Sequence, residues 1–376
     1  MFPSGGRLFF YADSDGEDEG AELWSSDGTG SGTSLVHTFE PTTAEVREAK
    51  ATAGDTLFLL RSAGSDLELW RTAAGGLEQI APPGLQATNP PRIEALGNRV
   101  YFLVQGAEER ELWTSDGTAA GTRQLTLPGS VTDLAPFQGR LFFNVGPELW
   151  SRDKATGKMS PLVSYPAGTE SIPGPKFLGV HGGRLWYEAH RSGTGDNLSA
   201  RVLWSTDGTA AGTTSYPDVP IGTELSPIAL LISAGSRMFL SVGGHLWVSD
   251  GTAAGTRRFP GEPFTSGKPV LLGGRLFYWQ RDGLWSSDGT AAGTQPVLDA
   301  SGAKIAWDPW EVLAGFGEHV YFVGATGELW RTDGSPAGTV KVGARFPEQL
   351  TPAQNRLFFS AWDAATGREL WALDPQ

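Results

Sequence analysis

The stretch ELWTSDGTAAGT, residues 111–122, decides how this chain folds. Near copies of it stand at 203–213, 246–256 and 284–294. A phrase of this length that returns along one chain marks an internal repeat, and a repeat sets the architecture before any other signal does. The question that it raises is whether the phrase is a binding site or a structural turn.

The Leu-Trp pair of the phrase is its most regular part. Its Trp recurs at 24, 70, 113, 150, 204, 247, 285, 330 and 371, so that successive copies lie 37 to 54 residues apart. An apolar, aromatic segment precedes every Trp. These segments are GRLFF (6–10), DTLFL (55–59), NRVYF (98–102), GRLFF (139–143), GRLWY (183–187), SRMFL (236–240), GRLFY (274–278), EHVYF (318–322) and NRLFF (355–359).

Each of these nine units reads as four strands, which we label A to D. In the unit 129–163, VTDLAPF predicts strand A, QGR a turn, LFFNV strand B, ELWSR strand C and SPLVS strand D. Aromatic and branched residues favour strands, whereas Gly, Asp and Pro favour the joins. Repeated four-stranded units of this length are typical of a β-propeller.

The phrase ELWxSDGTxxGT resembles the bacterial ELWxxDGT repeat family. Six units keep Asp-Gly-Thr/Ser and the second Gly-Thr, whereas the units around Trp70, Trp150 and Trp371 depart from the pattern. The resemblance covers essentially the whole chain. It implies a repeat of exported bacterial proteins without an assigned activity. The matching segments are 27–33, 116–122, 207–213, 250–256, 288–294 and 333–339.

We therefore expect an all-β fold, a single β-propeller domain over residues 1–376, with nine blades of roughly 42 residues. Eight blades is the alternative, because propellers typically have four to eight. The first unit offers only MFPS as strand A, and the last stops at LWALDPQ, without a strand D. How the ring closes is therefore left open by the sequence.

Composition narrows the class of protein. Gly (51) and Pro (25) are frequent, which suits many short strands joined by tight turns. The absence of Cys excludes disulfides and thiolate metal sites. A formal charge of -13 argues against a nucleic-acid partner. No apolar run is long enough for a membrane span, and the start shows no signal peptide. The resemblance to exported repeat proteins implies a secreted or cell-envelope location, and we expect a monomer.

Two interpretations compete for the repeated phrase. In one, a ring of carboxylates binds cations. In the other, Asp-Gly forms a tight turn, in which Asp bonds its own backbone and Gly takes a positive φ. We favour the turn, because single carboxylates one blade apart cannot share a cation. The residues concerned are Asp27, Asp116, Asp207, Asp250, Asp288 and Asp333.

The segments that vary between units carry the candidate site. In a propeller the A–B and C–D turns share one face, and the B–C and D–A loops share the other. The repeated phrases fall on the first face, so we expect function on the second. One loop, 11–23, spaces Asp13, Asp15 and Asp18 like part of a calcium loop, but the full pattern is absent. Calcium is the one cofactor that the sequence suggests, and only weakly.

Two further loops are candidates for ligand contact. His190, Arg191 and Asp196 in 188–202 are suited to a polar ligand, although a solvated loop is the alternative. In 299–313, Trp307 and Trp310 flank Asp308 and do not fit the Leu-Trp position. Their rings are suited to stacking on a sugar or an apolar ligand, and the alternative is that they plug the central channel.

Catalysis is not indicated. The five His lie in different units without zinc-ligand spacing, and neither a nucleophile elbow nor a P-loop is present. We expect a non-enzymatic binding or scaffold module whose partner is a glycan or protein of the bacterial envelope or exterior. The alternatives are a polysaccharide-acting enzyme with carboxylates near the channel mouth, and a purely structural surface protein.

Overall fold

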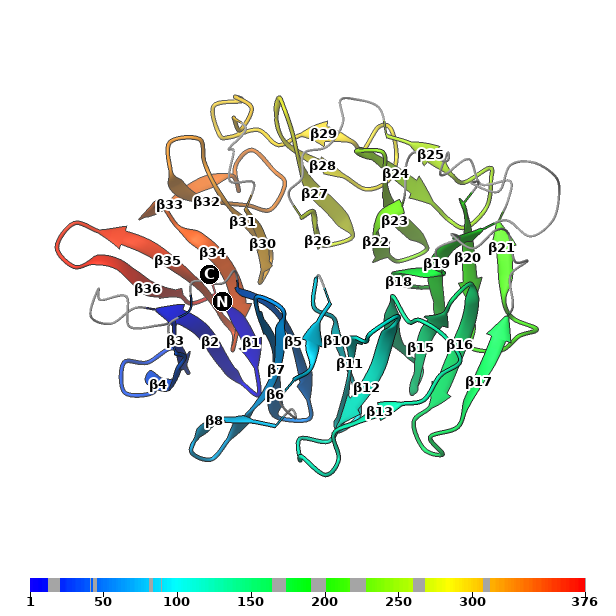
Figure 1. The fold of residues 1–376 in the computed structure, drawn as a ribbon. Helices are drawn as coiled ribbons and strands as arrows, with labels where there is room; N and C mark the ends of the chain where they lie inside the picture. The colour runs from blue at the N-terminus through cyan, green and yellow to red at the C-terminus, as the bar shows by residue number, and fades with distance from the viewer. Residues whose placement is uncertain are drawn as a thin grey trace. The chain divides into compact units, whose positions relative to one another are not determined.

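The computed structural model shows an all-β chain, with no helix among the residues it describes (Figure 1). Contacts divide the chain into two compact units, which are taken in turn below. The structure describes residues 1–12, 21–40, 42, 46–80, 84–88, 90–163, 174–190, 201–216, 228–259, 268–306 and 312–375.

One compact unit comprises Ser4–Ser26 and Ser31–Pro217. Its strands are joined to their sequence neighbours in antiparallel sheets, and β9 links two repeats into one nine-stranded sheet. The first sheet holds β1 (Phe2–Ser4), β2 (Arg7–Ala12), β3 (Glu22–Ser26) and β4 (Ser34–Thr38). The nine-stranded sheet holds β5 (Val46–Ala53), β6 (Thr56–Ala63), β7 (Asp66–Ala73), β8 (Gly76–Gln79), β9 (Gln86–Ala87), β10 (Ile93–Leu96), β11 (Arg99–Gln105), β12 (Arg110–Ser115) and β13 (Arg123–Leu125). Two four-stranded sheets follow, β14 (Leu134–Phe137), β15 (Arg140–Val145), β16 (Glu148–Asp153) and β17 (Met159–Val163), then β18 (Lys176–His181), β19 (Arg184–His190), β20 (Arg201–Thr206) and β21 (Thr214–Tyr216).

The other compact unit comprises Asp218–Gln376 together with Met1–Pro3 and Asp27–Gly30. It has three four-stranded sheets and one three-stranded sheet. The four-stranded sheets are β22 (Ile228–Ala234), β23 (Arg237–Val242), β24 (His245–Ser249) and β25 (Arg257–Arg258); β26 (Val270–Leu272), β27 (Arg275–Gln280), β28 (Gly283–Ser287) and β29 (Gln295–Pro296); and β30 (Leu313–Phe316), β31 (His319–Val323), β32 (Glu328–Thr332) and β33 (Val340–Arg345). The last sheet holds β34 (Glu348–Ala353), β35 (Arg356–Asp363) and β36 (Gly367–Leu373).

All nine Leu-Trp segments lie on strands that pair antiparallel with the aromatic segment before them. The prediction of repeated four-stranded antiparallel units is therefore confirmed. In every hairpin the Trp stands opposite an aromatic residue or Leu of strand B. The pairs are Phe10 and Trp24, Leu59 and Trp70, Phe102 and Trp113, Phe143 and Trp150, Tyr187 and Trp204, Leu240 and Trp247, Tyr278 and Trp285, Phe322 and Trp330, and Phe359 and Trp371.

Strand A of the unit 129–163 is shorter than predicted, beginning at Leu134 rather than Val131. The cause is a side chain that takes the place of a strand partner. The backbone N–H groups of Thr132 and Asp133 donate to Oδ1 of Asn144, at 3.0 and 2.8 Å. An amide oxygen thus satisfies two donors that the ladder would otherwise have taken.

Five of the A–B turns join their strands through two consecutive residues with positive φ, and the turns at Gly54, Gly97, Gly235 and Gly317 have one. In the fourth repeat, Gln138 and Gly139 have φ of 46° and 71°, and in the ninth Gln354 and Asn355 have 50° and 57°. Two consecutive positive φ values are required by a type I′ turn, whose twist matches that of the strands it connects. Gly, Asn and Gln at these positions keep each hairpin tight.

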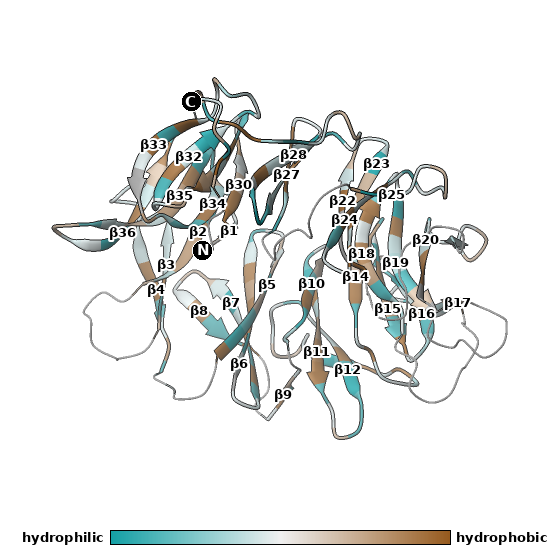
Figure 2. Ribbon diagram, turned by 90° about the horizontal axis from the view of Figure 1, so that it is seen from above, coloured by the Kyte–Doolittle hydropathy of each residue, from teal (hydrophilic) through white to brown (hydrophobic). Residues whose placement is uncertain are grey.

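The hydrophobic cores lie between the sheets of consecutive repeats. Strand β15 is representative: Leu141 and Phe143 pack into a cluster with the preceding repeat, whereas Phe142 packs into a cluster with the following one. All three are fully buried, because successive side chains of a strand point to opposite faces and both faces are covered. Figure 2 shows hydrophobic segments running along the strands.

A second contact joins consecutive repeats. The Phe of strand B approaches the backbone of the first Gly in the next repeat's Asp-Gly turn. A Cβ added at Gly117 would lie 3.4 Å from Phe58, and one at Gly208 would lie 3.6 Å from Phe142. The same contact recurs between Gly334 and Phe277 (3.4 Å), and between Gly28 and Phe358 (3.2 Å). The ninth repeat therefore meets the first repeat's turn as other repeats meet their successors.

We predict that Arg356→Ala destabilises the chain by about 1.5 to 3 kcal/mol, the value of a charged hydrogen bond. Arg356 Nη1 donates to the Gly28 carbonyl at 2.7 Å, which ties the ninth repeat to the first turn. Urea unfolding measures the loss. The control is Arg368→Ala in the same sheet, because its ion pair with Glu348 is exposed and worth less than about 1 kcal/mol. Equal losses would contradict the proposed role of Arg356.

Candidate functional site

The sequence-based ligand contacts fall largely outside the residues that the structure describes. This holds for both Trp of the segment 299–313 and for the acidic loop 11–23. His190 ends β19, and nothing is described of its side chain. The roles of these residues in ligand or calcium contact remain predictions. The positions outside the described residues are Asp13, Asp15, Asp18, Arg191, Asp196, Trp307, Asp308 and Trp310.

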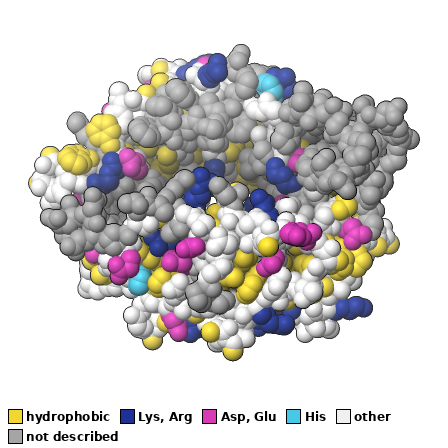
Figure 3. All heavy atoms as spheres, in the orientation of Figure 1, with side chains coloured by type: hydrophobic (Ala, Val, Ile, Leu, Met, Phe, Trp, Pro, Cys, Tyr) yellow, Lys and Arg dark blue, Asp and Glu magenta, His cyan; other side chains and the backbone are white. Residues whose placement is uncertain are grey.

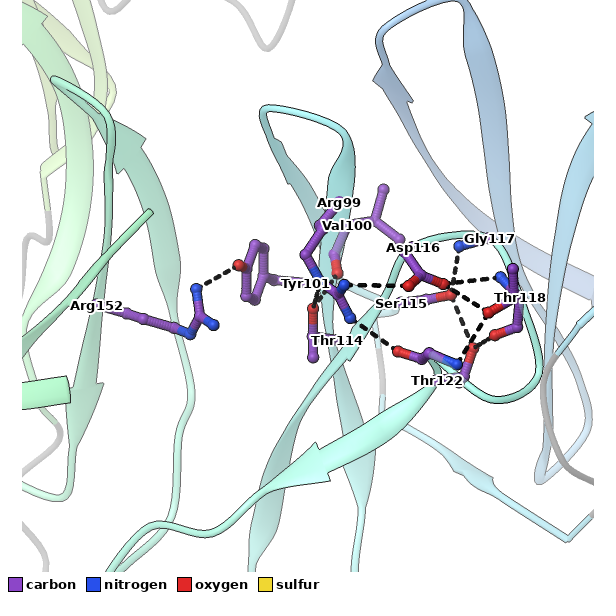
Figure 4. Close-up of polar contacts among 11 residues, drawn as sticks. Arg99, Val100, Tyr101, Thr114, Ser115, Asp116, Gly117, Thr118, Thr122 and Arg152 are labelled. Carbon is purple, nitrogen blue, oxygen red and sulfur yellow. Dashed lines mark hydrogen bonds and ion pairs between the residues drawn. The ribbon is translucent and has the colours of Figure 1, made fainter. Parts of the chain in front are cut away.

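The carboxylates of the repeated Asp-Gly turns accept hydrogen bonds from residues of the same turn, as Figure 4 shows for Asp116. Asp116 Oδ1 accepts hydrogen bonds from the Thr118 backbone N–H at 3.0 Å and from the Thr118 hydroxyl at 2.8 Å. Gly117, between them, has a φ of 89°, which favours glycine. Asp27, Asp207, Asp250 and Asp288 bind the following Thr in the same way, and Asp333 accepts the backbone N–H of Ser335.

A buried pair of hydroxyls closes each turn, which the sequence interpretation missed. Ser115 and Thr122, seven residues apart, place their oxygens 2.8 Å from each other, and the Ser115 oxygen also accepts the Gly117 N–H at 3.0 Å. The signal was present in the sequence, because a Ser or Thr precedes every repeated Asp. The other pairs are Ser26 and Thr33, Thr206 and Thr213, Ser249 and Thr256, Ser287 and Thr294, and Thr332 and Thr339.

The second glycine of the phrase is required by the carboxylate. A Cβ at Gly121 would lie 1.9 Å from Asp116 Oδ1, and one at Gly212 would lie 2.0 Å from Asp207 Oδ2. The same clash would arise at Gly255, Gly293 and Gly338. The spacing of the second glycine thus reflects a close approach of its backbone to the Asp side chain.

In four repeats the Arg that opens strand B clamps the turn of its own repeat, and these are Arg7, Arg99, Arg184 and Arg275. Arg140, Arg237 and Arg356 donate instead to the Asp-Gly turn of another repeat. Arg99 donates from Nη1 to Asp116 Oδ2 at 3.2 Å and from Nη2 to the Gly121 carbonyl at 2.9 Å (Figure 4). Arg275 donates likewise to the Gly293 carbonyl at 2.9 Å. The recurrent GR and NR of the aromatic segments therefore serve the turn.

These bonds hold the pKa of the turn carboxyls below the ordinary value. For Asp116 the first cause is the Thr118 hydroxyl, followed by the Thr118 N–H and the Arg99 charge. The pKa is lowered in the same way at Asp207, Asp250 and Asp288, where a Thr hydroxyl is the main cause, and at Asp333, where the Ser335 N–H is. Within the described ranges no group of three or more His, Asp or Glu could hold a metal ion.

A cavity of about 270 Å³ lies where the D–A segments of three consecutive repeats meet. These are segments of the kind that the sequence predicts to carry function. Thr88, Pro90 and Arg92 come from before β10, Thr132 and Asp133 from before β14, and Gly174, Pro175 and Lys176 from the start of β18; Leu103 and Arg110 complete the lining. The cavity combines three cations, two hydroxyls and an apolar wall.

Asp133 is the buried anchor of this cavity. Its side chain is 9% exposed and forms an ion pair with Arg92. Oδ1 also accepts the Leu134 N–H at 3.0 Å, and Oδ2 accepts the Phe177 N–H at 2.8 Å. A carboxylate that accepts donors at both oxygens fixes the cavity's shape and holds Arg92 in place.

The other two cations, Arg110 and Lys176, also line the cavity. Lys176 lies 4.0 Å from Glu188 Oε1, and its side chain is 45% exposed, whereas Glu188 is buried. Arg110 lines the cavity from the start of β12, and its backbone N–H donates to Ser130. Figure 3 shows acidic and basic side chains interspersed on the face it draws. The cavity itself is lined by three cations and one carboxylate, Asp133, in a chain of net charge -13.

Comparison with known proteins finds distant structural likenesses alone. No family model and no curated protein matches the chain. The computationally designed Ika8 protein is 14% identical, with a TM-score of 0.48 over 88% of this chain and 98% of its own. BamB from Moraxella catarrhalis is 13% identical, with a TM-score of 0.46 over 88% of this chain and 97% of its own. Apo AztD from Citrobacter koseri is 11% identical, with a TM-score of 0.45 over 89% of this chain and 93% of its own. At these values no ligand, site or function is carried over.

The described residues form strands and no helix, so they include no helix that could cross a membrane.

We predict that Gly121→Ala destabilises the chain by about 1 to 3 kcal/mol, the usual cost of overpacking. The new Cβ would force the Asp116 carboxylate off its two Thr118 bonds. Gly75→Ala is the matched control, because a Cβ there meets nothing within 4 Å. Denaturant midpoints measure both variants. An unchanged midpoint for Gly121→Ala would show that the carboxylate moves aside without loss.

We also predict acid sensitivity that originates in the turns. Because the folded-state pKa values lie below the ordinary 3.8, the ionised turns stabilise the fold fully above that pH. The contribution is lost as pH falls through the lowered values. Asp116→Asn/Asp250→Asn keeps an acceptor oxygen but removes the titration, so its melting temperature should fall less steeply below about pH 4.

The charge-matched control for this experiment is Asp55→Asn/Glu109→Gln. Both are exposed carboxylates outside the repeated Asp-Gly turns. Thermal unfolding at a series of pH values compares the three proteins. If the melting temperature of the control falls as gently below about pH 4 as that of the turn variant, the acid sensitivity comes from net charge and not from the turns.

Proposed function

We propose that this chain is a non-enzymatic binding module that takes an acidic glycan, built as a nine-bladed β-propeller of the ELWxxDGT repeat type. The observation that carries the ligand class is the cavity lined by Arg92, Arg110 and Lys176. Cationic side chains bind carboxylates, hydroxyls bind the sugar's own hydroxyls, and an apolar wall covers a sugar's C–H face. The cavity offers all three.

A ring of nine blades is supported by the recurrence of one contact. Phe58 with Gly117 and Phe142 with Gly208 join consecutive repeats, and Phe358 with Gly28 joins the ninth repeat to the first turn. Blades that each pack against the turn of another blade in this way are typical of a propeller.

A binding role is favoured over hydrolysis by the state of the cavity's carboxylate. Both oxygens of Asp133 accept hydrogen bonds and one is paired with Arg92, which suits an anchor and not a proton donor. The resemblance to exported bacterial repeat proteins favours the envelope or exterior, where uronic-acid polymers are available as ligands.

We predict saturable binding of oligouronates, measured by calorimetry, that weakens as ionic strength rises, with neutral glucans binding far less. Arg110→Ala/Lys176→Ala should weaken binding at least about tenfold. The matched control, Arg123→Ala/Lys158→Ala, removes the same charges at exposed positions outside the cavity and should bind normally.

The same glycan-binding measurements test the segment 299–313, which contains Trp307 and Trp310. Loss of binding in Trp307→Ala/Trp310→Ala, with the cavity variant unaffected, would move the ligand site to the segment 299–313. No binding to any glycan would overturn the carbohydrate proposal and favour a protein-partner scaffold.

A further inference from the structure

Two threonine hydroxyls, those of Thr88 and Thr132, line the cavity that contains Arg92, Arg110 and Lys176. All of these residues belong to one compact unit. A hydroxyl can donate one hydrogen bond and accept two, so its role toward a ligand depends on which of these the protein already uses. The two threonines differ in this respect.

The Thr132 hydroxyl is made a donor by the amide of Asn144. Oδ1 of Asn144 accepts the backbone N–H groups of Thr132 and Asp133, at 3.0 and 2.8 Å. Nδ2 therefore points the other way, and it donates to the Gly146 carbonyl at 3.3 Å and to Thr132 Oγ1 at 3.0 Å. Because Oγ1 accepts from the amide, its own proton is directed away from Asn144. Among the described residues none accepts that proton, so it is available to a ligand in the cavity.

The Asn144 amide is held in this one orientation. Its residue is 1% exposed, and exchanging Oδ1 with Nδ2 would set an NH₂ group against two N–H donors. Gly174, which also lines the cavity, packs directly on the amide: a Cβ there would lie 2.4 Å from Nδ2. Asn144 thus joins two of the three segments that form the cavity.

The Thr88 hydroxyl is left as an acceptor. It donates its proton to the Pro90 carbonyl at 3.2 Å, and the residue is only 3% exposed. An oxygen that has given its proton to the chain keeps its lone pairs for another donor. The carboxylate of Asp133 is occupied by Arg92 and by two backbone N–H groups, so Thr88 is the lining side chain best placed to accept from a ligand hydroxyl.

This arrangement matches the groups of a uronate ring. A carboxylate accepts hydrogen bonds and donates none, whereas a sugar hydroxyl can donate. A uronate carries both on one ring. The cavity, at about 270 Å³, lies near the lower end of the range for small-molecule sites, roughly 300 to 1,000 Å³, which suits one ring and not a longer stretch of a glycan.

We propose that Thr132 and Thr88 determine the specificity of the cavity. Thr132 donates to the carboxylate of a uronate ring, and Thr88 accepts from a free hydroxyl of the same ring. Asn144 is a positioning residue that sets the direction of the Thr132 proton. The proposal rests on the acidic-glycan function proposed above, and adds that the bound ring must keep both its charge and a free hydroxyl.

Two ligands separate the two roles. One is trigalacturonate, and the other is its O-methylated form, in which every hydroxyl is methylated and the carboxylates stay free. Val keeps the shape of Thr without its hydroxyl. By calorimetry, Thr132→Val should weaken both ligands at least about tenfold, because it removes a hydrogen bond to a charged group. Thr88→Val should weaken trigalacturonate about threefold to tenfold and leave the O-methylated ligand unchanged.

Three control variants accompany these measurements. Thr88→Ser and Thr132→Ser keep the hydroxyl and should bind nearly as well as the unchanged chain. Thr126→Val removes an exposed hydroxyl of the same unit that does not line the cavity, and it should bind normally. Thermal unfolding checks that every variant folds.

Asn144→Asp tests the positioning role. Its carboxylate still accepts both backbone N–H groups, but the second oxygen now accepts from Thr132 Oγ1 instead of donating to it. The Thr132 proton is thereby turned away from the ligand. Trigalacturonate binding should weaken at least about tenfold, and by clearly less in the Thr132→Val background, where no proton is left to redirect. Equal losses in the two backgrounds would assign the effect to the added charge and contradict the role of Thr132.

Failure of this proposal is distinguishable from failure of the proposed function. If the unchanged chain does not bind trigalacturonate, both are overturned. If it binds, and Arg110→Ala/Lys176→Ala weakens binding while both Val variants bind as before, the cavity takes an acidic glycan that the threonines do not select. A loss in Thr88→Val that is equal for the two ligands would overturn its role as the acceptor.

Discussion

The structure depends on the burial of strand B on both of its faces. Residues such as Leu141 and Phe142 point in opposite directions from one strand and are both fully buried. A single sheet cannot supply this cover, so each repeat requires the one before it and the one after it. The energetic unit is therefore the interface between neighbouring sheets.

The turns serve that packing. In four Asp-Gly turns the first glycine lets a Phe ring of another repeat approach the backbone, as Phe142 does at Gly208. The carboxylate, the two hydroxyls and the Arg then hold the turn rigid, with the Asp oxygens bound to neighbours in the chain. Six carboxylates that look like a ligand set in the sequence are in this way committed to internal bonds.

Function is favoured where the repeats differ from each other. The cavity around Asp133 arises because three D–A segments of unlike sequence converge on it. The last repeat differs from the others as well, because its Trp362 and Trp371 are exposed.

By itself the sequence determined the repeat, its strands and its turns, because these rest on contacts within about forty residues: the Trp-to-aromatic pairs, the Asp-Gly turns and the tight A–B joins. It also contained the Ser-to-Thr hydroxyl pair, which spacing alone could have revealed. Only the tertiary structure decided that Arg92 lies against Asp133, 41 residues away, and that Leu370 stays half-uncovered while its eight counterparts are buried. Those facts follow from which sheet packs beside which, and local patterning carries no record of that.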